Sequence, residues 1–258
     1  MFTITLANLK GGTGKTTLAV NLAAGVARLT RPKNLRVLLV DLDAQGNATE
    51  WLLGEKPDAN VPASAAALLG ELPKGAIVPV PDHPGLDLLP GTNALATTNL
   101  ELGTKRGDHE GLLRTALTTA HPGIVVLDTP PSRSMILLSA LAMTNVLLIP
   151  VLPGFFSISG LAELLELARG SCPRALHGVV LFATRPGTAA TDETRVFLRK
   201  QFARENLFRA EIRISSSATM LPAKRKTVWD RGHGDPRGAE DYEALIREIR
   251  SRYLTRMK

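Results

Sequence analysis

The sequence predicts an α/β fold: a single-domain, doubly wound, mostly parallel sheet with helices on both faces. Two observations predict it. Short apolar runs, typical of strands buried on both faces, alternate with longer stretches of helical spacing. A glycine-rich loop lies between the first apolar run and the first helical stretch, as in phosphate-binding strand–helix units. We expect residues 1–258 to form one domain, with a basic C-terminal part at residues 185–258.

Each expected element has its own pattern. Continuous apolar runs predict strands at residues 4–7, 37–40, 124–127, 146–149 and 179–182. Helical spacing predicts helices behind the glycine-rich loop and near residues 108–120, 133–143, 157–169 and 191–205. Residues 57–90, rich in proline and alanine, are expected to form a helix-containing excursion between strands. From residue 240 to Met257, apolar side chains share one helical face, which favours a helix packed on the sheet over one on a membrane surface.

The composition excludes several classes of protein. Hydrophobic residues make up 44% and charged residues 21% of the chain, which excludes wholesale disorder. The single cysteine, Cys172, excludes a disulfide framework, a zinc site built from cysteine pairs and an iron–sulfur cluster held by one chain. The N-terminus lacks the pattern of a signal peptide, and the apolar stretches are too interrupted to span a membrane. We therefore expect a cytoplasmic protein.

The net charge of +7 is unevenly distributed along the chain. Residues 1–184 hold 14 basic and 14 acidic residues, whereas residues 185–258 hold 17 basic and 10 acidic residues. Such an asymmetry indicates an anionic partner, either nucleic acid or a membrane surface. A solvated basic surface without a partner fits the charge equally well.

The glycine-rich loop carries the clearest chemistry. Its glycines let backbone N–H groups close around phosphate oxygens, and the following helix adds positive potential at its N-terminus. Lys15 would reach the β- and γ-phosphates, and the Thr16 hydroxyl would coordinate Mg²⁺. Leu9 stands where the strict loop pattern requires glycine. The residues expected to bind the nucleotide here are Lys10, Gly11, Gly12, Thr13, Gly14, Lys15, Thr16 and Thr17.

This loop variant, K-G-G-x-G-K-S/T-S/T, resembles the deviant Walker A motif of the ParA/MinD family of P-loop ATPases. Residues 40–49 look like the D-x-D-P-Q-G-N motif of that family, with Ala44 in place of the proline. Residues 124–132 are similar to its Walker B region, D-x-P-P-S, and residues 148–161 to its I-P-V-x-P…G-L segment. The chain looks most like the small ParA partition ATPases.

The resemblance implies ATP and Mg²⁺ as cofactors and gives single residues their roles. Lys10 would reach across a sandwich dimer to the nucleotide of the partner, and Lys15 and Asp43 would complete the catalytic set. Asp43 would orient or activate the attacking water. Asp41 would support the magnesium shell, to which Asp128 would bind through water. Without the resemblance, Asp41 and Asp43 fit a helix cap or a turn equally well.

The adenine site is the point at which the chain departs from the family pattern. Family members often carry an asparagine after the strand expected at 179–182, whereas this chain continues with Ala183, Thr184, Arg185 and Pro186. We expect backbone groups at Arg185 and Pro186 to hold the adenine ring.

The resemblance implies an ATP-hydrolysing DNA partition protein associated with the nucleoid. Its ATP-dependent homodimer would bind DNA non-specifically, and a centromere-binding ParB-like partner would stimulate hydrolysis and release it. Basic residues expected to contact DNA are Arg195, Arg199, Lys200, Arg204, Lys224, Arg225 and Lys226. The alternatives are a MinD-like membrane switch or a positioning protein for another cargo, and a metabolic ligase that shares the loop. A reductase like the nitrogenase iron protein would need two cysteines per chain.

Overall fold

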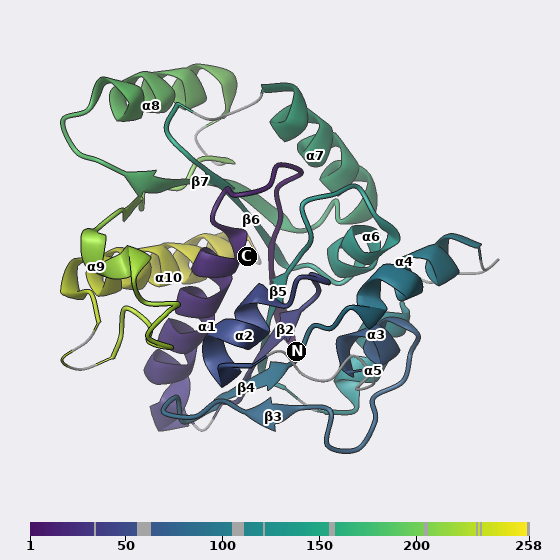
Figure 1. Cartoon of the computed structure of the whole chain (residues 1–258). Coiled ribbons are helices and arrows are strands. Elements are labelled where there is room, and N and C mark those ends of the chain that lie inside the picture. Colours follow the sequence, from purple (N-terminus) through teal and green to yellow (C-terminus); the bar gives the residue numbers. More distant parts are fainter. Residues whose placement is uncertain are drawn as a thin grey trace.

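An eight-stranded sheet runs through the centre of the molecule, with helices on both of its faces (Figure 1). The computed structural model describes residues 1–33, 35–55, 63–104, 111–120, 122–154, 158–203, 206–230, 232 and 234–256. The strand order is β3-β4-β2-β5-β1-β6-β7-β8. All pairs are parallel except β3 with β4 at one edge. The predicted doubly wound α/β fold is thereby confirmed.

The strands are short and mostly buried. Their bounds are β1 Phe2–Leu6, β2 Val37–Asp41, β3 Val78–Pro79, β4 Leu86–Leu89, β5 Ile124–Asp128, β6 Val146–Val151, β7 Leu176–Thr184 and β8 Ile212–Arg213. The five strands that the apolar runs predict are all present. They occupy the middle of the sheet, where side chains must be apolar toward both layers of helices.

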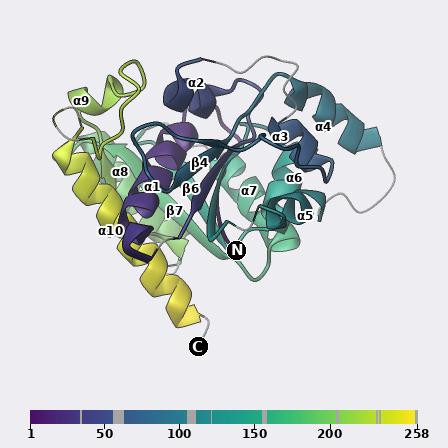
Figure 2. The same ribbon diagram turned by 90° about the horizontal axis from the view of Figure 1, so that it is seen from below.

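Two helical layers cover the sheet, with α1 and α10 on one face and α5, α6 and α7 on the other (Figure 2). The α-helices are α1 Lys15–Thr30, α2 Asn47–Leu53, α3 Ala63–Leu68, α4 Ala94–Thr104, α5 Leu112–Thr118, α6 Met135–Ala142, α7 Ile158–Ser171, α8 Ala189–Gln201, α9 Ser216–Thr219 and α10 Pro236–Arg256. Alternate side chains of a strand point to opposite faces of the sheet. In β5, Val126 packs with α1, whereas Val125 and Leu127 pack with α5 and α6.

The C-terminal helix packs on the sheet layer, as the apolar pattern predicts. Tyr242, Leu245 and Ile249 of α10 are buried in the same core as α1. The Tyr242 hydroxyl donates to the carbonyl of Thr17 at 3.2 Å, which connects α10 to the first turn of α1. The apolar face of this helix is therefore used inside the protein.

Residues 57–90 contain α3, as expected, but also β3 and β4, which the sequence pattern does not predict. β4 pairs in parallel with β2 and so widens the sheet by one buried strand. Asp87 interrupts its apolar run, and this is why the run is hard to recognise as a strand. The carboxylate of Asp87 accepts a hydrogen bond from Arg36 Nε at 2.7 Å, which compensates its charge near the protein surface.

A glycine-to-alanine pair tests the packing of α1. A Cβ at Gly25 would lie 2.4 Å from Trp229, whereas a Cβ at Gly170 of α7 would meet nothing within 4 Å. We expect Gly25→Ala to lower the free energy of unfolding by about 1–3 kcal/mol, because the added methyl overpacks the helix contact. Gly170→Ala should raise it by up to ~1 kcal/mol through helix propensity. Urea unfolding of both variants measures this, and equal stabilities would contradict the packing at Gly25.

Candidate active site

Three loops that carry the predicted site residues meet at the carboxyl ends of β1, β2 and β5. In the sheet register, Asp128 of β5 lies beside Leu6 of β1 and Asp41 of β2. The glycine-rich loop follows β1 directly and leads into α1 (Figure 1). Ligands of open parallel sheets bind at this edge. The sheet therefore brings together segments that are about 30 and 90 residues apart in the sequence.

The glycine-rich loop leaves the N-terminus of α1 open. Gly14 precedes the helix with a φ of 88°, and no side chain caps the first turn. A Cβ at Gly14 would lie 2.2 Å from the Phe182 ring, so only glycine fits this contact. Gly11 and Gly12 are exposed, and a Cβ on either would meet nothing within 4 Å. Uncapped N–H groups with open space in front of them are suited to bind phosphate.

Lys15 is folded back into this loop. Its side chain is nearly buried, and Nζ donates to the carbonyls of Asn8 at 3.2 Å and Lys10 at 3.3 Å. Burial lowers the pKa of the Lys15 ammonium, while the negative charges of Asp128 and Asp43 raise it. Lys15 therefore lies close to both carboxylates, and the two carbonyls are contacts that a phosphate oxygen can replace.

Asp128 is a buried carboxylate without hydrogen bonds. The residue has no exposed surface, and within the described chain neither carboxylate oxygen has a hydrogen-bond partner. Burial raises the pKa of Asp128 well above its usual value and Asp41 adds to the rise, whereas Thr16 and Lys15 oppose it. An uncompensated buried carboxylate is costly. A cation beside Asp128 and Thr16 would remove that cost.

The oxygen groups at this site suit Mg²⁺, which shares its ligands with water and substrate phosphates, better than a metal whose ligands all come from the protein. Among the described residues, no group of three or more His, Cys, Asp or Glu side chains could hold a metal ion. Mg²⁺ binds oxygen ligands and usually keeps several waters, with one or two protein ligands and phosphates of the substrate. The Thr16 hydroxyl and, through water, the Asp128 carboxylate are the groups that could hold Mg²⁺ at the foot of the phosphate loop.

Asp41 has a different environment although it lies beside Asp128 in the sheet. One carboxylate oxygen accepts hydrogen bonds from Thr49 N at 2.9 Å and Thr49 Oγ1 at 2.7 Å, and the other accepts from Asp43 N at 3.2 Å. Burial raises the pKa of Asp41 to about 6, against the opposing effect of these hydrogen bonds. Its role as a supporter of the metal stays a prediction, since its oxygens already hold the loop together.

Asp43 lies in the tight turn between β2 and α2. Its carboxylate accepts from Gln45 N at 3.0 Å, and its carbonyl accepts from Gly46 N at 2.9 Å. Gly46 has a φ of 63°, which lets α2 begin at once with Asn47. The half-buried carboxylate of Asp43 is near enough to Lys15 to raise the pKa of that ammonium. This places it at the phosphate loop, as the motif predicts.

A cavity of about 250 Å³ lies beside the first turns of α1. Residues of five elements, of the connection between β8 and α9 and of the loop between α9 and α10 line it, namely Thr17, Asn21, Phe182, Ala183, Ile212, Arg213, Ile214, Ala218, Thr219, Pro222, Val228, Asp235, Gly238 and Tyr242. Sequence reasoning did not find it, because no local pattern connects these segments. Arg185 and Pro186 are exposed next to it in the chain, and Arg185 N and O bond to Thr191 Oγ1 and Thr188 Oγ1.

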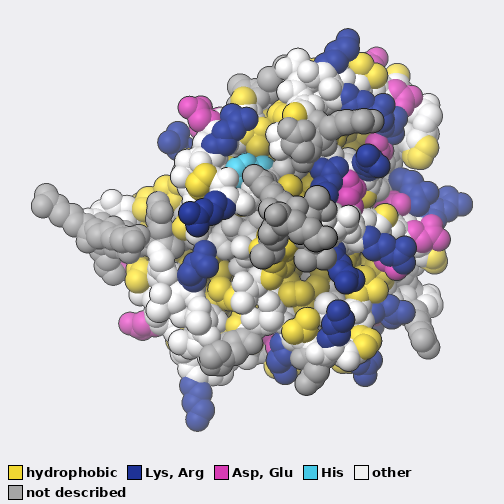
Figure 3. All heavy atoms as spheres, turned by 180° about the vertical axis from the view of Figure 1, so that it is seen from behind, with side chains coloured by type: hydrophobic (Ala, Val, Ile, Leu, Met, Phe, Trp, Pro, Cys, Tyr) yellow, Lys and Arg dark blue, Asp and Glu magenta, His cyan; other side chains and the backbone are white. Residues whose placement is uncertain are grey.

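The basic residues predicted to contact DNA lie in two places. Arg199 and Lys200 are exposed on α8, and Lys224 is exposed between α9 and α10. Arg195 instead binds Glu211 at 2.8 Å and Asp192 at 2.6 Å. Arg204 lies outside the described residues. Figure 3 shows lysine and arginine side chains spread over the face opposite to that of Figure 1, interspersed with acidic and hydrophobic groups.

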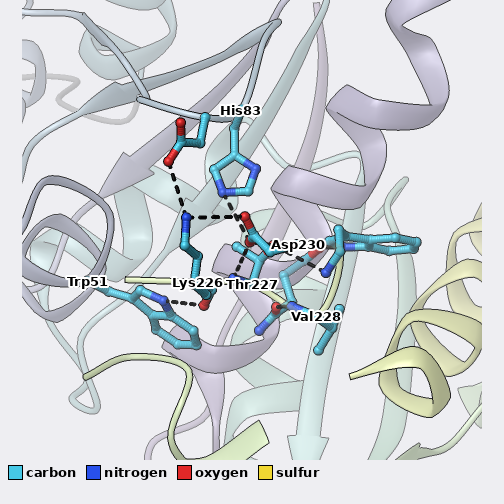
Figure 4. Close-up of polar contacts among 9 residues, drawn as sticks. Trp51, His83, Lys226, Thr227, Val228 and Asp230 are labelled. Carbon is cyan, nitrogen blue, oxygen red and sulfur yellow. Dashed lines mark hydrogen bonds and ion pairs between the residues drawn. The ribbon is translucent and has the colours of Figure 1, made fainter. Parts of the chain in front are cut away.

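Lys226 belongs to a partly exposed polar network (Figure 4). Its Nζ lies 3.2 Å from Asp82 and 3.8 Å from Asp230, and its carbonyl accepts from Trp51 Nε1 at 2.9 Å. The neighbouring Arg225 donates to the carbonyl of Gly54 at 3.3 Å. The segment that precedes α10 is thereby attached to α2 and to the turn between β3 and β4, an arrangement that a run of three basic residues does not reveal.

Comparisons with known proteins match almost the whole chain. The family model described as an AAA domain matches residues 1–170. The chromosome-partitioning ATPase Soj of Thermus thermophilus is 37% identical over 254 residues, or 96% of this chain and 95% of the relative. The chromosome partitioning protein ParA of Myxococcus xanthus is 32% identical over 260 residues, or 96% of this chain and 88% of the relative.

A solved structure of similar fold carries nucleotide and metal. It is described as a cobyrinic acid a,c-diamide synthase from Mycobacterium smegmatis with bound ATP analog and magnesium. It shares 25% sequence identity with this chain at a TM-score of 0.77 and covers 97% of this chain and 96% of its own.

Because the buried Asp128 carboxylate has no hydrogen-bond partner among the described residues, we expect the free energy of unfolding to depend on pH in the absence of nucleotide and metal. Because the pKa of Asp128 is raised on folding, its contribution to the free energy of unfolding falls as the pH rises above the unfolded value of about 4. Asp128→Asn removes this contribution. In urea unfolding with EDTA, we expect the variant to lose less stability than the wild type between pH 5 and pH 8. It should also be the more stable protein at pH 8, and a less stable variant at pH 8 would contradict the uncompensated burial.

Proposed function

This chain belongs to the ParA/MinD family of deviant Walker A ATPases, and from this premise we propose how it acts as a partition ATPase. Two ATP-bound copies form a sandwich dimer that binds DNA without sequence preference. A ParB-like centromere-binding partner stimulates hydrolysis and releases the dimer from DNA in the cytoplasm, at the nucleoid. The observation that carries the proposal is the meeting of an open phosphate loop, Lys15, Asp43 and the uncompensated Asp128 at one sheet edge.

The ATPase chemistry needs positioning and charge neutralisation more than covalent catalysis. The N–H groups at the start of α1 hold the phosphates, and Lys15 exchanges its carbonyl contacts for the β- and γ-phosphates. Mg²⁺ supplies neutralisation of phosphate charge when it is bound. Thr16 and Asp128 are the residues that would hold it, Asp128 through water. Asp43 orients the water that attacks the γ-phosphate.

The base of the nucleotide fits at the ends of β7 and β8. The cavity there begins at Thr17, next to the phosphate loop, and its wall is formed largely by apolar side chains such as Phe182 and Ile214. An adenine ring in this cavity, with Arg185 and Pro186 nearby, would bury its faces against these side chains. The exposed Lys10 completes the site from the other protomer, so ATP acts as the switch that favours the dimer.

DNA binding rests on the basic C-terminal part of the chain. Among the described residues of the predicted set, Arg199, Lys200, Lys224 and Arg225 are exposed. Arg225 donates to the carbonyl of Gly54, so Arg199, Lys200 and Lys224 carry most of the phosphate contacts. Arg195 and Lys226 are engaged in ion pairs with acidic neighbours and so contribute less. Contacts of this kind are independent of sequence and weaken with salt, and a dimer doubles their number.

Two other functions, a membrane switch and a ligase, would give different experimental results. A membrane switch would need an apolar surface, yet the apolar face of α10 is buried, and no helix of the described residues is long and apolar enough to cross a membrane. A ligase is favoured by the likeness to the structure described as a cobyrinic acid a,c-diamide synthase. ATP turnover that requires a small-molecule acceptor and ignores DNA would identify a ligase, and sedimentation with liposomes in ATP would identify a membrane switch.

Variants at Asp43 and Lys10 should affect the dimer in different ways. Asp43→Ala should bind ATP, form the dimer and fail to turn over, because the water loses its orienting group. Lys10→Ala should keep nucleotide binding by the monomer but weaken the dimer, while Lys15→Ala should lose nucleotide binding or hydrolysis altogether. Size-exclusion chromatography with ATP and a nucleotide-binding titration measure these outcomes. A monomeric Asp43→Ala protein, or an unaffected Lys10→Ala dimer, would contradict the assigned roles.

DNA binding should depend on nucleotide and salt. We expect the wild type to bind non-specific duplex DNA more tightly in ATP than in ADP. The double variant Arg199→Ala, Lys200→Ala should weaken this binding and reduce the slope of log affinity against log salt by about 1 per lost phosphate contact. Arg247→Ala is the control, since Arg247 is exposed but paired with Glu243. Equal and negligible binding in ATP and ADP at low salt would refute the DNA-binding proposal.

A further inference from the structure

The first turn of α2 holds a buried hydroxyl that connects three segments of the active site. Thr49 has no exposed surface. Its Oγ1 donates to Asp41 at 2.7 Å and accepts from Gly91 N at 2.9 Å. Its backbone N–H donates to the same carboxylate oxygen at 2.9 Å. Thr49 therefore joins the end of β2, the start of α2 and the loop after β4.

The carboxylate of Asp41 passes this restraint on to the catalytic turn. Its second oxygen accepts from Asp43 N at 3.2 Å, so the backbone of Asp43 is tied to the same group that Thr49 holds. Gly91 closes the other side, because a Cβ at that position would lie 2.8 Å from Asp41 Cγ and 2.9 Å from Oδ1. Two hydrogen bonds from Thr49 therefore restrain the carboxylate, and the backbone of Gly91 packs closely against it.

We propose that Thr49 is a positioning residue for ATP hydrolysis: by fixing the Asp41 carboxylate, it holds the backbone of Asp43 where the Asp43 side chain can orient the attacking water. This inference rests on the proposed role of Asp43. It assigns Asp41 to the support of the loop, in contrast to Asp128, whose oxygens are left for the metal.

A hydroxyl is required at position 49 for a chemical reason. The group must donate to a carboxylate and accept from an N–H at the same time, and in a buried site only serine or threonine can do both with this size. Removing it leaves Gly91 N–H without its acceptor and Asp41 with one bond fewer. A displacement of about 1 Å in a reacting group can reduce the rate about 100-fold.

The test compares Thr49→Val with Thr49→Ser and with Thr98→Val. Valine keeps the branched shape, and serine keeps the hydroxyl. Thr98 is the matched control, because it is buried and its hydroxyl makes a local bond to the carbonyl of Ala94 at 3.1 Å. We expect Thr49→Val to lower kcat by about 10- to 100-fold and to leave the Kd of ATP and the half-saturating Mg²⁺ concentration within about twofold. Thr49→Ser and Thr98→Val should hydrolyse ATP like the wild type.

A second variant reaches the same carboxylate from the opposite side. Gly91→Ala adds a methyl group against Asp41 while the Thr49 side chain stays in place, although Gly91 N also donates to Thr49 Oγ1. Gly103→Ala is its control, because a Cβ there would meet nothing within 4 Å. We expect Gly91→Ala to reproduce the loss of kcat with unchanged ATP binding. This variant keeps the inference testable if Thr49→Val does not fold, and thermal unfolding of every variant records that case.

Three outcomes would overturn the inference. They are wild-type kcat in both Thr49→Val and Gly91→Ala, a raised Mg²⁺ requirement in Thr49→Val, and a failure of Thr49→Ser to restore turnover. The proposed role of Asp43 fails separately, if Asp43→Ala hydrolyses ATP at the wild-type rate. An inactive Asp43→Ala protein together with fully active Thr49→Val and Gly91→Ala proteins would remove the role of Thr49 alone.

Discussion

The burial of two adjacent carboxylates at the carboxyl ends of β2 and β5 is the constraint on which the site depends. Asp41 and Asp128 are neighbours in the sheet register, and each raises the cost of charge on the other. A sheet buried on both faces offers them little water. The two carboxylates differ in how their negative charge is compensated. Asp41 receives three hydrogen bonds, from Asp43 and Thr49. Among the described residues, Asp128 has no hydrogen-bond partner by distance and angle, and Lys15 and Thr16 only partly offset its burial, which is why we propose that a cation binds there.

The different environments of Asp41 and Asp128 connect the stability of the fold to the proposed function of the site. Burial makes the charge of Asp128 costly, so we expect magnesium and nucleotide to stabilise the folded state when they bind. The satisfied Asp41 instead makes the turn of Asp43 rigid and ties it to α2. At its other end, α2 is bonded through Trp51 and Gly54 to residues 225 and 226, so the turn that holds Asp43 and the segment before α10 are attached to the same short helix.

Much of this arrangement could be predicted from the sequence. The apolar runs predicted the five central strands, and the motifs after three of them predicted site residues that the structure brings to one edge of the sheet. β4 was missed because Asp87 interrupts its apolar run and is compensated only by Arg36, far away in sequence. The cavity beside α1 and the ion pairs of Arg195 with Glu211 and of Lys226 with Asp82 were also missed, because they too join segments that are far apart in the sequence. Contacts between distant segments decide which polar side chains are compensated, and a local pattern does not contain them.

A crystal structure with Mg²⁺ and a non-hydrolysable ATP analogue tests the central claim most directly, since it shows which carboxylate serves the metal. We predict that the metal binds Thr16 Oγ1 at about 2.1 Å and reaches Asp128 through a water molecule. The Asp41 carboxylate should remain bonded to Thr49 and Asp43. A metal bound by Asp41, or phosphates held outside residues 10–17, would contradict the division of roles between the two carboxylates.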